Sequence, residues 1–186
     1  MQSKEQMIGE LLTNPALTSD WIQAATDVVE QYPENIVLDD LNALSAQQIL
    51  MMNEFIKYFD NNIELVLAFY HEHNYNETQL QVILQALGKN LTIDKINEVV
   101  DEEVPYATMN WLLAAVAEGY DQFEDPIYRN YHPDQLQEVF SGLKDGIEVS
   151  DYDRVDMDSK KMQVIRHARC VGLTVEIDEE MKLTIY

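Results

Sequence analysis

Apolar residues recur three and four positions apart along much of this chain. Residues 78 to 93 show the pattern clearly, because Leu80, Ile83 and Leu87 share one face of a helix at these spacings. Asn90 follows them, and asparagine tolerates the left-handed backbone conformation that ends many helices. The pattern therefore predicts an amphipathic helix that stops near Asn90.

The same arrangement returns three more times. The further apolar faces are Met109, Leu112 and Val116, then Leu136, Val139 and Leu143, then Met162 and Ile165. The first apolar positions of the four copies, beginning at Leu80, are 29, 27 and 26 residues apart, and stepping back from Leu80 by 31 and then 28 residues reaches Ile49 and Trp21. Six units fit this spacing. Because any amphipathic helix has apolar residues at such intervals, six similar helices without common ancestry are the alternative.

A second column of positions supports the repeat. Ten residues after each first apolar position stands a residue suited to a helix stop, and an apolar residue follows it at once. The pairs are Asn90 with Leu91, Gly119 with Tyr120, Gly146 with Ile147, and Gly172 with Leu173. A stop followed by an apolar anchor is typical of a shared C-cap geometry. The first two units depart from it, with Gln31 before Tyr32 and Phe59 before Asp60.

These patterns predict an all-α fold of stacked helical repeats, either a solenoid-like array or an irregular bundle. We expect one domain over residues 1–186, with divergent helices in 1–75 and the clearer repeats in 76–176. Short helical segments are expected between the long helices, one of them capped by Asp94. The tail from Val175 alternates apolar and polar residues around an acidic turn, which favours a small β-hairpin.

The best copy also carries a recognisable motif. It supplies Gln135, Leu136, Val139, Gly142, Leu143, Gly146, Ile147, Val149, Ser150 and Tyr152. This resembles the repeats Gln-Met-x-x-Ile-Arg-x-Gly-Leu-x-x-Gly-(Leu/Ile)-x-Val-Ser-x-Tyr of proteins carried by phages, plasmids and conjugative elements of low-GC Gram-positive bacteria. The likeness is good over residues 132–176 and loose over 78–128; the last copy has Ala168 and Arg169 where the pattern has Gly and Leu. The resemblance implies a mobile-element context and structural repeats without catalytic residues.

Charge narrows the class of partner. The 186 residues include 34 Asp and Glu against 12 Lys and Arg, a formal net charge of -22, while 46% are hydrophobic. Such a chain can bury a core, but its surface repels nucleic acid and anionic membranes and attracts basic proteins. The start of the chain has no leader pattern, no apolar run is long enough to span a bilayer, and the single cysteine suits a reducing compartment, so we expect a cytoplasmic protein.

The acidic residues are unevenly placed. Residues 1–128 hold 22 acidic and 4 basic residues, a balance of -18, whereas 129–186 hold 12 and 8, a balance of -4. One local concentration is Glu30, Glu34, Asp39 and Asp40. We predict that partner binding uses two further clusters, namely Asp94, Glu98, Asp101, Glu102 and Glu103, and Glu118, Asp121, Glu124 and Asp125. Lys160, Lys161, Arg166 and Arg169 make the final helix basic.

Candidate catalytic and metal chemistry is sparse. His71 and His73 point to different sides of a helix, so we interpret them as solvated. The aspartates at 151, 153, 156 and 158 lack the Gly and Glu of an EF-hand at the required positions. Arg166, His167 and Arg169 stand near Cys170 and would lower its pKa, but its position suits a small core residue. We therefore expect no cofactor, no metal and no enzymatic activity.

Two functional hypotheses remain from different classes. In the first, this is a binding protein that mimics DNA and inhibits a host defence nuclease, of the anti-CRISPR or anti-restriction type, by presenting carboxylates to its basic groove. In the second, it is a helical-repeat adaptor or scaffold whose acidity serves only solubility. Both predict a protein partner, basic or nucleic-acid-binding in the first case, and neither predicts direct contact with nucleic acid or membrane.

Overall fold

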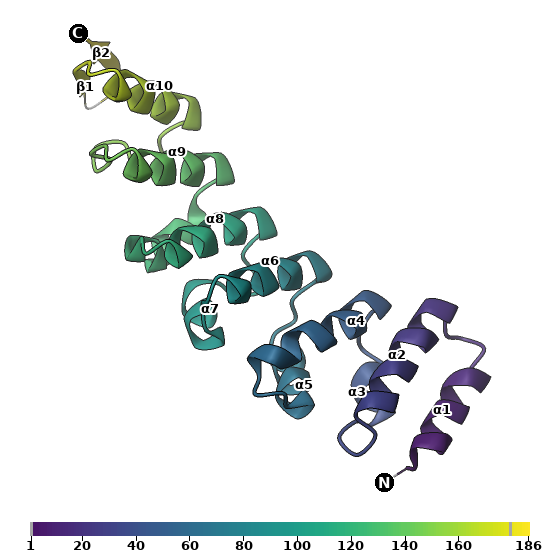
Figure 1. Cartoon of the computed structure of the whole chain (residues 1–186). Helices are drawn as coiled ribbons and strands as arrows, with labels where there is room; N and C mark the ends of the chain where they lie inside the picture. Colours follow the sequence, from purple (N-terminus) through teal and green to yellow (C-terminus); the bar gives the residue numbers. More distant parts are fainter. Residues whose placement is uncertain (1, 179) are drawn as a thin grey trace. The chain divides into compact units, whose positions relative to one another are not determined.

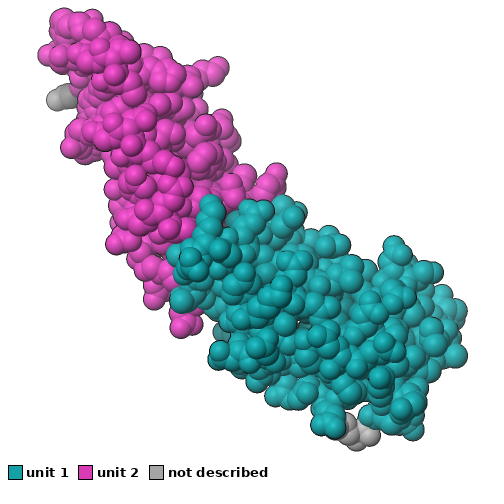
Figure 2. All heavy atoms as spheres, in the orientation of Figure 1, with its two compact units in different colours: residues 1–93 teal, residues 94–186 magenta. Residues whose placement is uncertain are grey.

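The computed structural model of this chain describes residues 2–178 and 180–186. These residues form an all-α fold of ten α-helices and three short 3-10 helices, with a two-stranded antiparallel β-hairpin at the C-terminus (Figure 1). The helices gather into two compact units, residues 1–93 and 94–186 (Figure 2). The sequence predicted a single domain, and that remains a prediction because compactness does not test whether either unit folds alone.

The first unit is a row of helices in which each long helix packs on the next. Its elements are α1 (Lys4–Thr13), α2 (Ser19–Gln31), α3 (Leu38–Leu41), α4 (Ala46–Phe55), η1 (Ile56–Tyr58), α5 (Ile63–Glu72) and α6 (Glu77–Gly88). Helix α1 packs on α2, α2 on α4, and α4 on α5 and α6 (Figure 1). Trp21 and Ile49, the predicted first apolar positions of two units, are both buried, and the indole N–H of Trp21 donates to the Leu44 carbonyl at 2.9 Å. The predicted apolar faces therefore form the core between α2 and α4.

Glutamine helps to start several of the helices. A cap side chain accepts a hydrogen bond from the backbone N–H three residues on, and a glutamine at that position bonds back to the N–H of the cap. The pairs are Ser3 with Gln6, Ser45 with Gln48, Asn76 with Gln79 and, in the second unit, His132 with Gln135. This capping box satisfies backbone donors that the helix itself leaves unpaired.

The second unit repeats the stacking. It contains most of α7 (Ile93–Val99), then α8 (Tyr106–Ala117), η2 (Asp121–Glu124), η3 (Pro126–Asn130), α9 (Pro133–Lys144), α10 (Ser159–Cys170), β1 (Val175–Ile177) and β2 (Leu183–Ile185). Helix α9 packs between α8 and α10, and α10 also contacts β1 (Figure 1). The strands pair in the register Val175 with Ile185 and Ile177 with Leu183, which confirms the predicted hairpin.

The helix ends confirm the predicted column of stop residues. Asn90, Gly119, Gly146 and Gly172 have φ values of 70°, 87°, 70° and 82°. In each case the backbone N–H of the next residue donates to the carbonyl five positions back, which is the long bond of a Schellman motif. These bonds join Leu91 to Ala86 at 3.2 Å, Tyr120 to Ala115 at 3.1 Å, Ile147 to Gly142 at 2.9 Å and Leu173 to Ala168 at 3.0 Å.

One of the two divergent units has the same motif in a shifted position. After α4 and η1, Asp60 has a φ of 53°, and the N–H of Asn61 donates to the Ile56 carbonyl at 3.0 Å. The sequence comparison placed Phe59 in the stop column, one residue too early. The sequence did not reveal this shift because Asp and Asn can adopt positive φ without the glycine that marks three of the other copies.

Gly142 in α9 lies so close to the Tyr152 side chain that there is no room for a larger residue at this position. A Cβ atom built on Gly142 would lie 1.9 Å from the Tyr152 hydroxyl oxygen and 2.9 Å from Val149 Cγ1. Tyr152 is fully buried, and its hydroxyl has no hydrogen-bond partner among the residues described. The Gly and Tyr of the repeat motif are therefore one packing pair in this copy.

Candidate partner-binding surface

The predicted acidic site lies within the second unit. Asp94 belongs to the first turn of α7, so its prediction as a cap was wrong, although a carboxylate there still favours the helix dipole. The remaining predicted residues lie at the end of α7 and in the turn after it, at the end of α8, and in η2 and the start of η3: they are Glu98, Asp101, Glu102, Glu103, Glu118, Asp121, Glu124 and Asp125. Most of these residues are exposed, whereas Asp101 and Glu124 are half-buried.

Several of these carboxylates are already neutralised within the unit. The ion pairs are Glu124 with Lys95 at 2.6 Å, Glu98 with Lys95 at 3.4 Å, Asp101 with Arg129 at 2.6 Å, and Glu118 with Lys144 at 2.7 Å. Asp125 instead accepts a hydrogen bond from the N–H of Ile127 at 2.9 Å and caps η3. The acid predicted to bind a partner is thus partly used to hold this unit together.

Arg129 shows how such a pair serves the fold. Besides its contact with Asp101, its Nε donates to the Val99 carbonyl and its Nη2 to the Glu98 carbonyl, both at 2.9 Å. These carbonyls end α7 and would otherwise lack partners. One guanidinium from η3 therefore caps α7 and fastens the turn that follows it.

We expect Arg129→Ala to lower the free energy of unfolding of the second unit by about 2 kcal/mol, because hydrogen bonds made by a charged group are lost at a helix end. Urea unfolding in a Trp21→Phe background, followed by the fluorescence of Trp111 on α8, measures the change. Arg154→Ala is the matched control, because its exposed pair with Asp156 joins residues two positions apart, and we expect no measurable effect. Equal effects of the two substitutions would contradict the capping role.

The arginines of the final helix are also engaged. Arg166 pairs with Glu138 at 2.8 Å and with Asp145 at 3.1 Å, both from the preceding repeat. Arg169 forms a two-pronged pair with Asp151 and donates to the Glu148 carbonyl at 2.6 Å. The final helix carries the four basic residues that the sequence predicted: its two arginines pair with acidic residues of the preceding layer, and Lys160 and Lys161 are exposed.

The spacing of these pairs matches the repeat. Four of the pairs that join one layer to the next link residues 26 to 29 positions apart: 95 with 124, 101 with 129, 118 with 144, and 138 with 166. Since the repeat units are 26 to 29 residues long, each pair connects equivalent regions of neighbouring layers. A carboxylate one repeat length from a basic residue was the sequence signal that could have found them.

The first unit differs from the second because its acidic residues greatly outnumber its basic ones. Residues 1–93 contain 13 acidic residues and only three basic ones, Lys4, Lys57 and Lys89. No ion pair is formed within the described part of this unit, residues 2–93. The predicted site therefore did not include the unit in which, over residues 2–93, no carboxylate has a neutralising cation.

Helix α2 arranges three of them on one side. Asp20, Asp27 and Glu30 are exposed and stand seven and three residues apart, which places them on one face of the helix. Asp27 accepts a hydrogen bond from Gln23 at 2.7 Å, which orients it without neutralising it. The α2 face, defined by Asp20, Asp27 and Glu30, is therefore a row of negative charge directed away from the buried side at Ala24, Ala25, Val28 and Val29.

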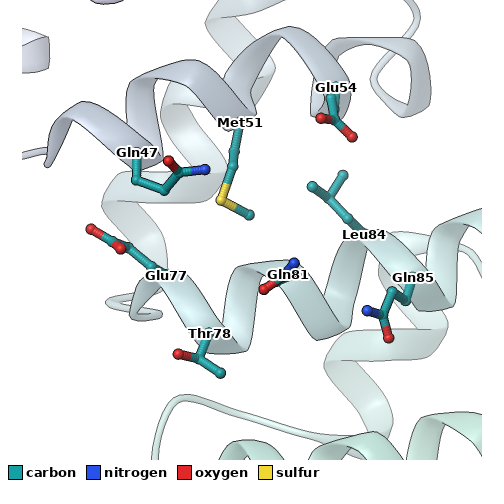
Figure 3. A pocket seen from close by; sticks show the side chains of 8 residues that line it. All are labelled: Gln47, Met51, Glu54, Glu77, Thr78, Gln81, Leu84 and Gln85. Carbon is teal, nitrogen blue, oxygen red and sulfur yellow. The ribbon is translucent and has the colours of Figure 1, made fainter. Parts of the chain in front are cut away.

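A groove lies between α4 and α6 in the same unit. It has a volume of about 420 Å³ and is lined by Gln47, Met51 and Glu54 from α4 and by Glu77, Thr78, Gln81, Leu84 and Gln85 from α6. Figure 3 shows Met51 pointing from α4 toward α6, with Leu84 directed back toward α4. Met51 is buried at the floor, whereas the glutamines and glutamates are exposed.

The aspartates near residue 155 have protein partners. Asp151 pairs with Arg169, Asp153 accepts from the Tyr128 hydroxyl, Asp156 pairs with Arg154, and Asp158 accepts from the N–H of Lys160 at the start of α10. Burial raises the pKa of Asp153, whereas its tyrosine hydrogen bonds act in the opposite direction. Each of these carboxylates thus has a structural contact within the described part of the chain.

Cys170 differs from its predicted environment. It is exposed, so its interpretation as a small core residue was wrong. Its pKa is raised, first by partial desolvation and then by its hydrogen bond to Asp145, and the opposing effect of Arg166 is smaller. The thiol is therefore less activated than its basic neighbours in sequence suggested.

Over residues 2–178 and 180–186, no group of three or more His, Cys, Asp and Glu side chains is arranged to hold a metal ion. Nor does that part of the chain contain a helix with the length and apolar character needed to cross a membrane. No family model matches the chain, and no curated protein or solved structure is significantly similar to it.

Proposed function

We propose that this chain is a non-catalytic binding protein that uses the carboxylates of its first unit to hold a basic protein surface. The observation that supports this is the contrast between the units: ion pairs neutralise acid in the second, whereas 13 acidic residues face three lysines without an ion pair in the described part of the first. Uncompensated carboxylates produce a negative potential that attracts and orients basic partners.

Within this proposal, the partner is a nucleic-acid-binding protein whose basic groove accepts the acidic surface in place of a phosphate backbone. The row of charge on the α2 face supports this, because a helix holds carboxylates at set intervals. The resemblance to repeats of mobile elements favours a nuclease of host defence as the target. This assignment makes the chain a DNA mimic of the anti-CRISPR or anti-restriction type.

The ion pairs of the second unit favour a second candidate function, that of a scaffold or adaptor. The ion pairs between layers of the second unit show acid that serves stability, which suits a scaffold or adaptor whose charge has no partner. In that case binding would depend on apolar contacts and would be insensitive to salt.

The test compares two variants that each remove three negative charges. D20N/D27N/E30Q neutralises the α2 face, and E102Q/E103Q/D121N neutralises part of the site predicted from sequence. Each immobilised protein captures host proteins, which are eluted by stepped salt or by duplex DNA. We expect DNA and salt to release a basic nucleic-acid-binding protein from the wild type, and the α2 variant to retain it about tenfold less well.

The matched variant should retain the partner nearly as well as the wild type does. Capture that resists salt and duplex DNA, and that survives neutralisation of the α2 face, would contradict the proposal and support the scaffold.

A further inference from the structure

The groove between α4 and α6 contains glutamine side chains whose amides are unpaired among the residues described. Gln47, Gln81 and Gln85 line it, and none of their side-chain amides has a hydrogen-bond partner among the residues described. Gln48, on the same helix as Gln47, is instead bonded within the fold, to the cap at Ser45 and to the Tyr75 carbonyl at 3.1 Å. The groove glutamines are thus available to a ligand.

Their spacing fits an extended chain. Gln81 and Gln85 are four residues apart on α6, which corresponds to about 6 Å along the helix axis. Two residues of an extended strand span about 6.6–6.8 Å. Because a side-chain amide offers one donor group and one acceptor, as a peptide unit does, the two glutamines can bond every second peptide unit of a chain laid along α6.

The charges around the groove select a cationic side chain. Glu54 and Glu77 border it, and none of the eight described residues that line it is a lysine or arginine. Figure 3 places Glu77 on α6 and Glu54 on α4, on either side of Met51. A lysine or arginine can lay its alkyl stem on Met51 and Leu84 while its charged group reaches a carboxylate. The floor and the rim therefore suit the two parts of the same side chain.

We propose that this groove between α4 and α6 binds an extended lysine- or arginine-containing segment of a partner protein. The groove is defined by its eight lining residues, Gln47, Met51, Glu54, Glu77, Thr78, Gln81, Leu84 and Gln85. Gln81 and Gln85 bond the backbone of the segment, and Glu54 and Glu77 receive its cations. This inference rests on the proposed function for the basic character of the partner. It adds a specific binding site, which charge on the α2 face does not require.

The experiment uses the full chain and a defined probe. The probe is a fluorescent, terminally blocked peptide of alternating lysine and threonine, and its companion has the same sequence with N-methylated backbone amides. Fluorescence anisotropy measures affinity, and the spectrum of the protein labelled with ¹³C in its methionine methyl groups locates the contact. We expect the Met51 methyl signal to shift, while the signals of Met109 and Met162, buried in the second unit, stay in place.

The glutamine variant decides whether the groove recognises a backbone. Q81A/Q85A should weaken binding of the unmethylated peptide about tenfold, the cost of two lost hydrogen bonds. Q137A/Q163A is the matched control, because it removes two exposed glutamines from α9 and α10, and its affinity should equal that of the wild type. The N-methylated peptide should bind the wild type about as weakly as the unmethylated peptide binds Q81A/Q85A.

The outcomes separate this inference from the proposed function. Both peptides could bind with equal, salt-sensitive affinity that Q81A/Q85A does not change, and the Met51 signal could stay in place. That result would overturn the proposal that the groove binds the peptide, and it would leave the acidic surface as the binding site. If the α2 face captures a basic partner but the peptides do not bind, the groove proposal is overturned and the proposed function stands. Loss of salt-sensitive capture by the whole chain would overturn the proposed function.

Discussion

Gly142→Ala will destabilise the second unit by about 3 kcal/mol, because the added methyl group has no room. Its Cβ would meet the Tyr152 hydroxyl at 1.9 Å and Val149 at 2.9 Å. Tyr152 is fully buried, so it cannot swing into solvent without opening the core around it. Urea unfolding in a Trp21→Phe background measures the effect, since Trp111 then reports on the second unit alone.

Two further substitutions identify the cause. Tyr152→Phe removes the hydroxyl that clashes and that has no hydrogen-bond partner among the described residues, so we expect it to be neutral or stabilising alone and to recover part of the loss in the double variant. Gly9→Ala is the matched control, followed through Trp21 in a Trp111→Phe background: Gly9 lies within α1, nothing lies within 4 Å of its added Cβ, and the substitution should stabilise the first unit by about 0.5–1 kcal/mol. No rescue by Tyr152→Phe would refute the clash.

The chain itself contains a related comparison. One repeat later, 26 residues on, Ala168 occupies the position of Gly142 and Asp178 that of Tyr152. The glycine is thus absent where the tyrosine is absent. This agrees with a close packing requirement in one copy, since helix propensity favours alanine wherever a methyl group fits.

Arg166→Ala will cost about 3 kcal/mol, because it leaves the Glu138 carboxylate buried without its cation. Glu138 is only 6% exposed, and the Arg166 Nε lies 2.8 Å from it. Partial burial alone would lower the pKa of Arg166, but the hydrogen bonds and charges of Glu138 and Asp145 outweigh it and raise the pKa. The guanidinium therefore remains charged throughout the neutral range, and denaturant unfolding at neutral pH measures the full effect.

A double-mutant cycle gives the control. Arg166→Met combined with Glu138→Gln removes both charges and keeps much of the packing volume, so we expect it to be less destabilised than Arg166→Ala. Arg166→Lys keeps one charge but cannot bridge Glu138 and Asp145 in the same way, and it should fall between the wild type and Arg166→Ala. Additive effects of the single substitutions would show that the pair contributes nothing.

Local features of the fold were predictable to different degrees. The predicted helix stops were correct at Asn90 and at the three glycines, because the energetic cost of a positive φ depends mainly on the residue itself. The prediction failed by one residue at Asp60, where η1 after α4 changes the position of the stop. Cys170 failed for a different reason: the helical pattern gives its place on α10, but the neighbouring layer leaves it exposed.

The candidate site was less predictable than the fold. The nine predicted residues were chosen by local density of charge, and density does not reveal pairing. Lys95, Arg129 and Lys144 neutralise several of them from other segments, whereas the sparser acid of the first unit has few cations near it in sequence. Counting basic residues over residues 1–93 would have identified the uncompensated unit, had its boundary been known.

The sequence by itself determined the helical periodicity, the helix stops, the C-terminal hairpin and the excess of acid. These depend on residue type and on neighbours within a few positions. Only the tertiary structure decided which carboxylates are paired, which glutamines line a groove and why Gly142 must lack a side chain. The pairing of carboxylates and the lining of the groove depend on segments about one repeat apart, whereas Gly142 depends on Tyr152, ten residues later; in each case the packing of one segment on another sets which side chains meet.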